Sequence, residues 1–176
     1  HGFQKTTLLD YPGHIAATVF TGSCNFRCPF CHNSDLVLFP QDVPIVSEEE
    51  IFTHLKKRQG ILDGVCITGG EPTLQTDLPD FILKVRSLGY AVKLDTNGYR
   101  PDALAKLCDD GLIDYVAMDI KHAPVKYNDI CQVTDFDFKR IQSSVDYLIH
   151  SSIPYEFRTT IVKELHTAED ISAIGS

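Results

Sequence analysis

The sequence predicts an α/β fold in which short strands alternate with helices and the strands run parallel. Short apolar runs, typical of strands covered on both faces, recur along the 176 residues. Segments with the apolar spacing of helices lie between them, and glycines or prolines mark many of the boundaries. Polar residues gather directly after the apolar runs. This alternation favours right-handed βαβ units and a parallel sheet.

Five runs are predicted to be strands, at residues 15–21, 64–68, 91–94, 115–118 and 155–161. A helix is expected from an N-cap at Ser47 to Gly60, with Glu50 completing a capping box. Further helices are predicted at 77–88, 101–109 and 138–150, and one beginning at 167. Residues 123–137 are expected to be irregular. Periodicity leaves two closures open, a doubly wound sheet and a full or partial (β/α) barrel; both place ligands at the carboxyl ends of the strands.

Composition narrows the functional classes. The chain has 16 basic and 24 acidic residues and a formal net charge of −8, which argues against nucleic acid as the main partner. No apolar run approaches the length of a membrane span, and no signal peptide is recognisable. We therefore expect a single domain over residues 1–176, with no membrane or nucleic-acid partner, in the cytoplasm.

Three cysteines follow the first predicted strand within one short loop. Cys24, Cys28 and Cys31 have C-x-x-x-C-x-x-C spacing. Clustered thiolates select zinc, Cu(I) or an iron–sulfur cluster. A closed zinc site needs four ligands, and His32 could complete one, although its position next to Cys31 is awkward for the same tetrahedral ion. Three thiolates on a [4Fe–4S] cluster would leave one iron open.

The other three cysteines are scattered. Cys66 lies in a strand-like run, Cys108 on a helical pattern and Cys131 in the irregular stretch. We expect each to be a small buried apolar residue and none to be a fourth ligand.

Polar residues follow the next three strands. Gly69, Gly70 and Glu71 form a turn that would let backbone approach a ligand, or that is simply tight. Asp95 and Thr96 could bind a cation or a ribose, or could satisfy their own backbone. Asp119 and Lys121 point to the same side of their strand, as a ligand site or as a salt bridge.

These segments together resemble a known family. The cysteine loop, with Phe30 before its last cysteine, resembles the cluster motif of radical S-adenosylmethionine (SAM) enzymes. The strings GFQKTTLLDYPG at 2–13, FTGSC at 20–24 and CHN at 31–33 are similar to those of glycyl-radical-enzyme activases, above all those of anaerobic ribonucleotide reductase.

The resemblance implies a fold and an activity. The fold would be a partial TIM-type barrel of six βα units, of which five are visible and the last is missing or truncated. The activity would be reductive cleavage of SAM at a [4Fe–4S] cluster to a 5′-deoxyadenosyl radical, which makes a glycyl radical on a partner enzyme. That partner would be anaerobic ribonucleotide reductase, with flavodoxin or ferredoxin as reductant. Pyruvate formate-lyase activation, another radical SAM reaction, or a non-catalytic iron–sulfur or zinc protein remain alternatives.

The resemblance also implies roles for individual residues. Cys24, Cys28 and Cys31 would bind the cluster, and Phe30 and His32 would lie against the adenine of SAM. Gly69, Gly70 and Glu71 would receive its amino group. Lys121 would meet its carboxylate. Asp95, Thr96 and Asp119 would help to hold a monovalent cation beside it. Arg158, on the last predicted strand, could face the same site.

Overall fold

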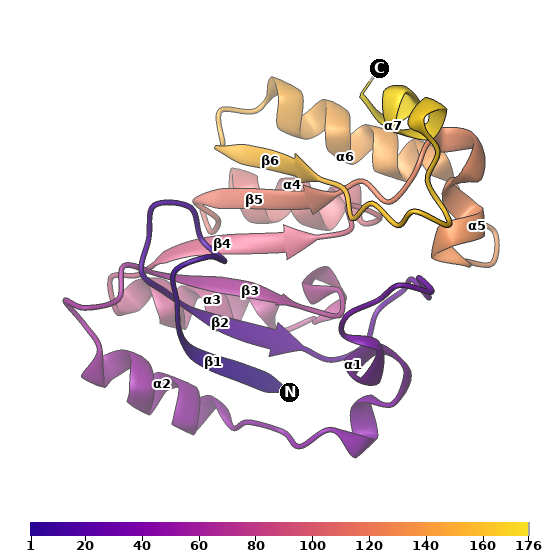
Figure 1. Cartoon of the computed structure of the whole chain (residues 1–176). Coiled ribbons are helices and arrows are strands. Elements are labelled where there is room, and N and C mark those ends of the chain that lie inside the picture. Colours follow the sequence, from indigo (N-terminus) through magenta and orange to yellow (C-terminus); the bar gives the residue numbers. More distant parts are fainter. Residues whose placement is uncertain (176) are drawn as a thin grey trace.

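Six strands form one sheet in the computed structural model, which describes residues 1–175 (Figure 1). Their order in the sheet is their order in the chain. The strands are β1 (Gly2–Thr7), β2 (Ala16–Thr21), β3 (Gly64–Gly69), β4 (Ala91–Thr96), β5 (Tyr115–Asp119) and β6 (Tyr155–Arg158). Neighbours from β2 to β6 pair in parallel, while β1 pairs antiparallel with β2.

The strand order decides between the two closures. A doubly wound sheet reverses its strand order at a switch point, and this sheet does not. β1 and β6 are not paired with each other, so the sheet stays open. The predicted partial barrel with parallel strands is therefore confirmed for β2 to β6, which are the five predicted strands.

The antiparallel strand β1 was not predicted. Its sequence, GFQKTT, is short and largely polar, so it lacks the apolar run that marks the buried strands. It lies at the edge of the sheet, where one side of the strand has no partner strand. β6 ends at Arg158, three residues earlier than expected.

The principal helices lie where the apolar spacing predicted them. They are α2 (Glu48–Lys57), α3 (Leu78–Ser87), α4 (Pro101–Asp109), α6 (Phe138–His150) and α7 (Ala168–Ile174). Ser47 caps α2 by accepting a hydrogen bond from the Glu50 amide. The stretch expected to be irregular contains a 3-10 turn and the short helix α5 (Tyr127–Cys131). A further short helix, α1 (Ser34–Leu38), follows the cysteine loop. Within residues 1–175 no helix combines the length and apolar character that crossing a membrane requires.

One face of the sheet packs against the helices and forms the core. Alternate strand residues, such as Val92 and Leu94 of β4, are fully buried in one apolar cluster with residues of α2, α3, α4 and α6. The period of two along each strand produces this segregation, because successive side chains point to opposite faces. We call this the helix-covered face.

The opposite, concave face is polar. Thr18, Cys66, Lys93 and Tyr115 lie in register across four neighbouring strands. The loop after β1 folds under this face at the N-terminal ends of the strands, where Tyr11 is 2% exposed and Thr18 donates to Asp10. The carboxyl ends of the strands are left as the accessible end of the concave face.

Candidate active site

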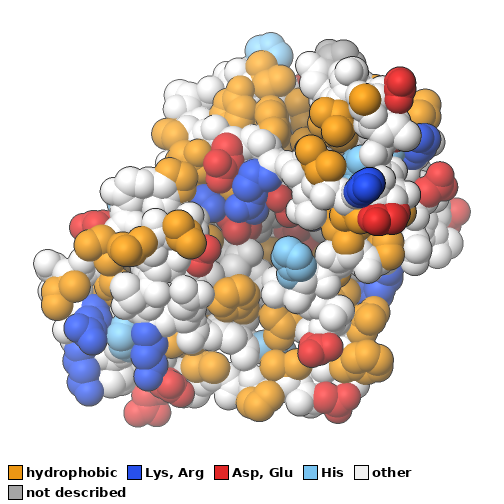
Figure 2. All heavy atoms as spheres, viewed as in Figure 1, with side chains coloured by type: hydrophobic (Ala, Val, Ile, Leu, Met, Phe, Trp, Pro, Cys, Tyr) orange, Lys and Arg blue, Asp and Glu red, His pale blue; other side chains and the backbone are white. Residues whose placement is uncertain are grey.

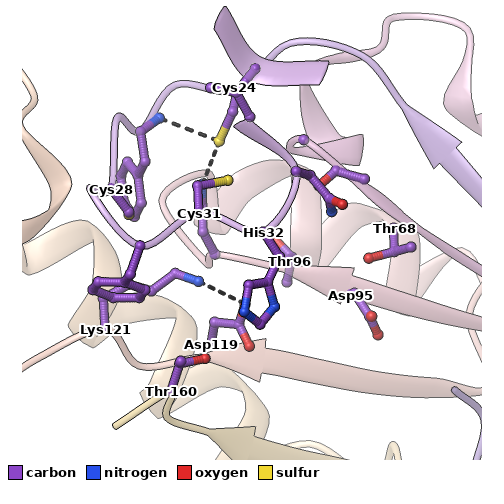
Figure 3. Close-up of a pocket in the computed structure, with 17 residues that line it drawn as sticks. Cys24, Cys28, Cys31, His32, Thr68, Asp95, Thr96, Asp119, Lys121 and Thr160 are labelled. Atoms are coloured by element: carbon purple, nitrogen blue, oxygen red, sulfur yellow. Dashed lines mark hydrogen bonds and ion pairs between the residues drawn. The ribbon is translucent and has the colours of Figure 1, made fainter. Parts of the chain in front are cut away.

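A cavity opens at the carboxyl ends of the strands, beneath the cysteine loop (Figure 3). In the space-filling view, acidic and basic side chains gather around a hollow near the centre of the visible face (Figure 2). Eleven of the twelve predicted site residues line the cavity. They are Cys24, Cys28, Phe30, Cys31, His32, Gly69, Gly70, Asp95, Thr96, Asp119 and Lys121. The cavity thus brings together predicted residues from four separate strand ends.

The cysteine loop is held in place by its own backbone and by one buried aromatic ring. Ser23 adopts a left-handed φ of 66°, and its amide donates to Leu36 O at 2.8 Å, which ties the start of the loop to α1. Phe26 is 2% exposed and packs edge-on against Tyr99 at 5.4 Å. The Cys31 amide donates to Cys28 O at 3.1 Å, so a tight turn joins the last two cysteines.

All three thiols of the loop are free and half-buried. Cys24 Sγ accepts from the Phe26 amide at 3.4 Å and from Asn97 Nδ2 at 3.7 Å, and burial raises its pKa to about 11. Among residues 1–175, no three metal-ligating side chains are already close enough to hold one ion. The donor chemistry of three free thiols on one cavity fits an iron–sulfur cluster.

Gly69 and Gly70 allow the loop after β3 to pack closely against the cysteine loop. A Cβ on Gly70 would lie 1.9 Å from Ser23 O, so only glycine allows this approach to the cysteine loop. Gly69 has a φ of 115°, which side chains disfavour, and its carbonyl accepts from Asn33 Nδ2 at 2.9 Å. Both residues still line the cavity. The end of β3 is therefore fixed directly against the predicted cluster loop.

The Glu71 side chain, predicted to receive the amino group of SAM, is engaged by protein donors. Its carboxylate is fully buried and does not line the cavity. It accepts from Thr73 N, Thr73 Oγ1, Thr96 Oγ1 and Asn97 N at 2.6–3.1 Å. Burial raises its pKa, although these four hydrogen bonds oppose that shift. Glu71 joins the ends of β3 and β4, and its oxygens are already occupied by protein donors.

Thr96 is also committed to this inner network. Its hydroxyl donates to Glu71 and accepts from the Gly98 amide at 3.1 Å. Thr96 is 4% exposed, so its surface reaches the cavity while its hydroxyl points to protein. The expectation that Thr96 helps to hold a cation stays a prediction, and its hydroxyl already makes two hydrogen bonds within the protein.

Arg158 joins the two aspartates at the cavity. Its guanidinium lies 3.3 Å from Asp95 Oδ2 and 3.2 Å from Asp119 Oδ1. The other oxygen of Asp95 meets the buried Lys93 at 2.6 Å, and that of Asp119 meets Lys121 at 2.8 Å. Three cations thus alternate with two carboxylates along the strand ends.

Lys121 retains its charge in this network. Burial alone would lower its pKa, but the contact with Asp119 outweighs burial and the pKa is raised. A protonated ammonium at the cavity can pair with an anionic ligand group. The salt bridge that the sequence left open as an alternative is present, and it places Lys121 and Asp119 on the cavity wall together (Figure 3).

The aromatic and imidazole candidates of the loop differ in exposure. Phe30 packs edge-on against His166 at 6.2 Å, whereas His32 is exposed. His166 is buried and stacks on His122 at 4.6 Å, so it joins the loop to the segment before α7. Periodicity offers no signal for such contacts, since these residues are far apart in the chain.

Sequence reasoning missed several lining residues and one contact. Asn33, Thr68, Asn97 and Thr160 line the cavity, each only one to three residues from a predicted site residue or strand end. Cys131 is fully buried, as expected, but its carbonyl oxygen accepts from the Arg27 amide of the cysteine loop at 2.8 Å. The influence of the Cys131 side chain lowers the pKa of the Cys28 thiol, and that of Cys28 raises the pKa of Cys131.

Comparisons with known proteins identify the family of the chain. The sequence profile of the Radical SAM superfamily matches residues 18–172. A protein of Methanocaldococcus jannaschii, provisionally named a glycyl-radical enzyme activating enzyme, is 34% identical over 99% of this chain and 72% of its own length. The pyruvate formate-lyase-activating enzyme of Clostridium pasteurianum is 31% identical over 69% of this chain and 52% of its own.

Other relatives have names that refer to different reactions. A protein of Thermococcus kodakarensis, provisionally named a GTP 3′,8-cyclase, is 28% identical over 85% of this chain and 48% of its own length. The solved structure of anSMEcpe with bound AdoMet shares the fold with a TM-score of 0.66 at 17% identity, over 90% of this chain and 46% of that one. This chain therefore spans about half the length of several relatives. The extent of the profile match and the identity with the archaeal protein show that the chain belongs to the radical SAM superfamily of enzymes.

Proposed function

We propose that this chain, acting as one domain in the cytoplasm, is a glycyl-radical-enzyme activase that uses a [4Fe–4S] cluster and SAM. The observation that supports this most is the cavity, where three free thiols face a charged set of strand ends. Cys24, Cys28 and Cys31 would hold the cluster. The bound cluster would supply the electron that cleaves SAM to methionine and a 5′-deoxyadenosyl radical.

The chain's own residues would bind and orient SAM. Lys121 would pair with the SAM carboxylate, and the backbone of Gly69 and Gly70 would meet its amino group. Phe30 and His32 would lie along the adenine. Asp95 and Asp119 would accept from the ribose or hold a monovalent cation, in competition with Arg158, which already pairs with both.

The partner would be a glycyl-radical enzyme, and we favour anaerobic ribonucleotide reductase. The similarity to named activating enzymes supports the class of partner. A flavodoxin or ferredoxin would supply the electron, and the net charge of −8 speaks against nucleic acid. Activation of pyruvate formate-lyase or another radical SAM reaction is the nearest alternative.

The test is anaerobic reconstitution with iron and sulfide, followed by dithionite and SAM. We expect 5′-deoxyadenosine from the wild-type chain and from Cys108→Ser, whose side chain is remote from the cavity, but none from Cys31→Ser. Electron paramagnetic resonance of mixtures with candidate partners would then show a glycyl radical with the true one. Absence of 5′-deoxyadenosine from an iron-loaded wild-type chain would contradict the proposal.

The Cys131 carbonyl accepts from the Arg27 amide at 2.8 Å, which holds Cys131 beside the cysteine loop and favours a second candidate, a non-catalytic site with four thiolates. Cys131 does not line the cavity, which weighs against it. Iron analysis of Cys131→Ser separates the two functions. The activase requires full iron content in this variant, whereas a four-thiolate site would lose much of it.

A further inference from the structure

Asn97 joins the end of β4 to the cysteine loop. It is 6% exposed and lines the cavity. Its side-chain nitrogen donates to Asn25 Oδ1 at 2.8 Å and to Cys24 Sγ at 3.7 Å. A side-chain amide carries two N–H donors, so each partner can receive one. One side chain thus connects the strand end to the first cysteine of the loop.

Two further contacts fix the orientation of Asn97. The groups around a side-chain amide determine which way its oxygen and its nitrogen point. Asn97 Oδ1 accepts from the Tyr99 amide at 3.0 Å, so the NH2 group faces the cysteine loop. The backbone amide of Asn97 donates to the buried Glu71 carboxylate at 2.7 Å, which holds the backbone in place. The fold therefore places an N–H donor beside Cys24.

Cys24 Sγ receives a second donor from its own loop. The Phe26 amide donates to it at 3.4 Å, so two N–H groups from distant parts of the chain point at one sulfur. A sulfur ligand becomes more negative when its iron–sulfur cluster is reduced, and an N–H donor interacts more strongly with a more negative acceptor. Hydrogen bonds to the sulfurs are among the features that set the reduction potential of such clusters. Donors at Cys24 would therefore favour the reduced state.

We propose that Asn97 is a positioning residue that raises the reduction potential of the cluster through its hydrogen bond to Cys24 Sγ. The inference rests on the proposed function, because it requires a cluster on the three cysteines of the loop. It gives a role to a residue outside the set predicted from the sequence. A higher potential would make one-electron reduction by the proposed flavodoxin or ferredoxin more favourable.

The test is a redox titration of the reconstituted chain without SAM, followed by electron paramagnetic resonance. Asn97→Ser removes the amide donor to Cys24, while its hydroxyl can still accept from the Tyr99 amide, as serine does in similar turns. We expect reduction to become about 3- to 10-fold less favourable, a shift of roughly 30–60 mV to more negative potential for one electron. Asn128→Ser is the matched control and should keep the wild-type potential. Asn128 Oδ1 also accepts a backbone amide, from Val133 at 3.2 Å, but Asn128 does not line the cavity.

A second measurement separates the hydrogen bond from a general change in structure. The chain is labelled with ¹⁵N at the side-chain nitrogen of asparagine, and the reduced cluster is studied by pulsed electron paramagnetic resonance. We expect a ¹⁵N coupling in the wild type that disappears in Asn97→Asp, which has nearly the same shape and keeps an oxygen for the Tyr99 amide.

Two results would overturn the proposal: a wild-type potential in the iron-loaded Asn97→Ser variant, or a ¹⁵N coupling that persists in Asn97→Asp. Neither measurement uses SAM, so the two proposals can fail separately. A wild-type chain that holds a cluster but forms no 5′-deoxyadenosine would contradict the proposed function and leave the role of Asn97 standing. An unshifted potential would remove that role while leaving the cleavage of SAM untouched.

Discussion

The two faces of one sheet carry different chemistry in this protein. On β4, Val92 and Leu94 enter an apolar core, while their neighbours Lys93 and Asp95 point to the concave face and form an ion pair at 2.6 Å. Side chains on the helix-covered face are buried in the core, whereas side chains on the concave face place charged groups at the cavity. Because the two faces differ in this way, substitutions one residue apart should separate effects on stability from effects on ligand binding.

Leu94→Ala should have the largest effect on stability. Leu94 is fully buried in the helix-covered core, and deleting its side chain should cost about 2–5 kcal/mol of unfolding free energy. Urea unfolding followed by circular dichroism measures this cost. Leu83→Ala, at a side chain 53% exposed, is the control and should change stability by less than about 0.5 kcal/mol. Equal effects at the two positions would refute the assignment of the core.

Glu71→Gln should destabilise less, by about 1–3 kcal/mol, because an amide NH2 would replace an oxygen that accepts from buried donors. The same unfolding measurement applies, with the exposed Glu49→Gln as control. A loss of SAM binding without any loss of stability would instead restore Glu71 as a ligand residue.

Lys121→Met should act on the ligand rather than on the fold. Losing a charge-assisted contact of about 1.5–3 kcal/mol should weaken SAM binding roughly 10- to 100-fold. Isothermal titration of the reconstituted chain measures the affinity. Lys84→Met is the control, because its ion pair with Glu48 is exposed and remote from the cavity. Unchanged affinity in Lys121→Met would remove this residue from the site.

The smallest effect concerns pH at α7. Asp170 accepts from Lys126 and from Thr167, which together hold its pKa well below the ordinary 3.8. Because the folded-state pKa is depressed, this stabilisation is present above about pH 4 and is lost as the pH falls below it. The protection factors of the amides in residues 165–175, which correct for the intrinsic exchange rate, should therefore fall in acid. Asp170→Asn should already show faster exchange at pH 6, and identical protection in both proteins would contradict this linkage.

Much of the fold could be predicted because its signals are local. Apolar runs marked all five parallel strands, and helical spacing placed 101–109 and 138–150 at their observed bounds. β1 was missed because an exposed edge strand such as Gly2–Thr7 needs no apolar run. The order of the strands could not be read from periodicity and depended on the family resemblance.

The site was predictable to a similar degree and for a related reason. Parallel strands bring their carboxyl ends to one edge, so residues just after each strand had to converge. Periodicity cannot show which partners each polar side chain forms hydrogen bonds with. Glu71 and Thr96 are satisfied by protein donors and acceptors, and the Cys131 carbonyl accepts from the Arg27 amide, about a hundred residues away in the chain. These long-range contacts carry no signal in sequence spacing.

We propose that three thiolates hold a cluster whose fourth iron is open to SAM. The most direct measurement is electron paramagnetic resonance of the reduced, reconstituted chain before and after SAM is added. We predict that SAM changes the spectrum of the cluster, and that Cys131→Ser behaves in the same way. A cluster spectrum that SAM leaves unaltered would contradict the claim.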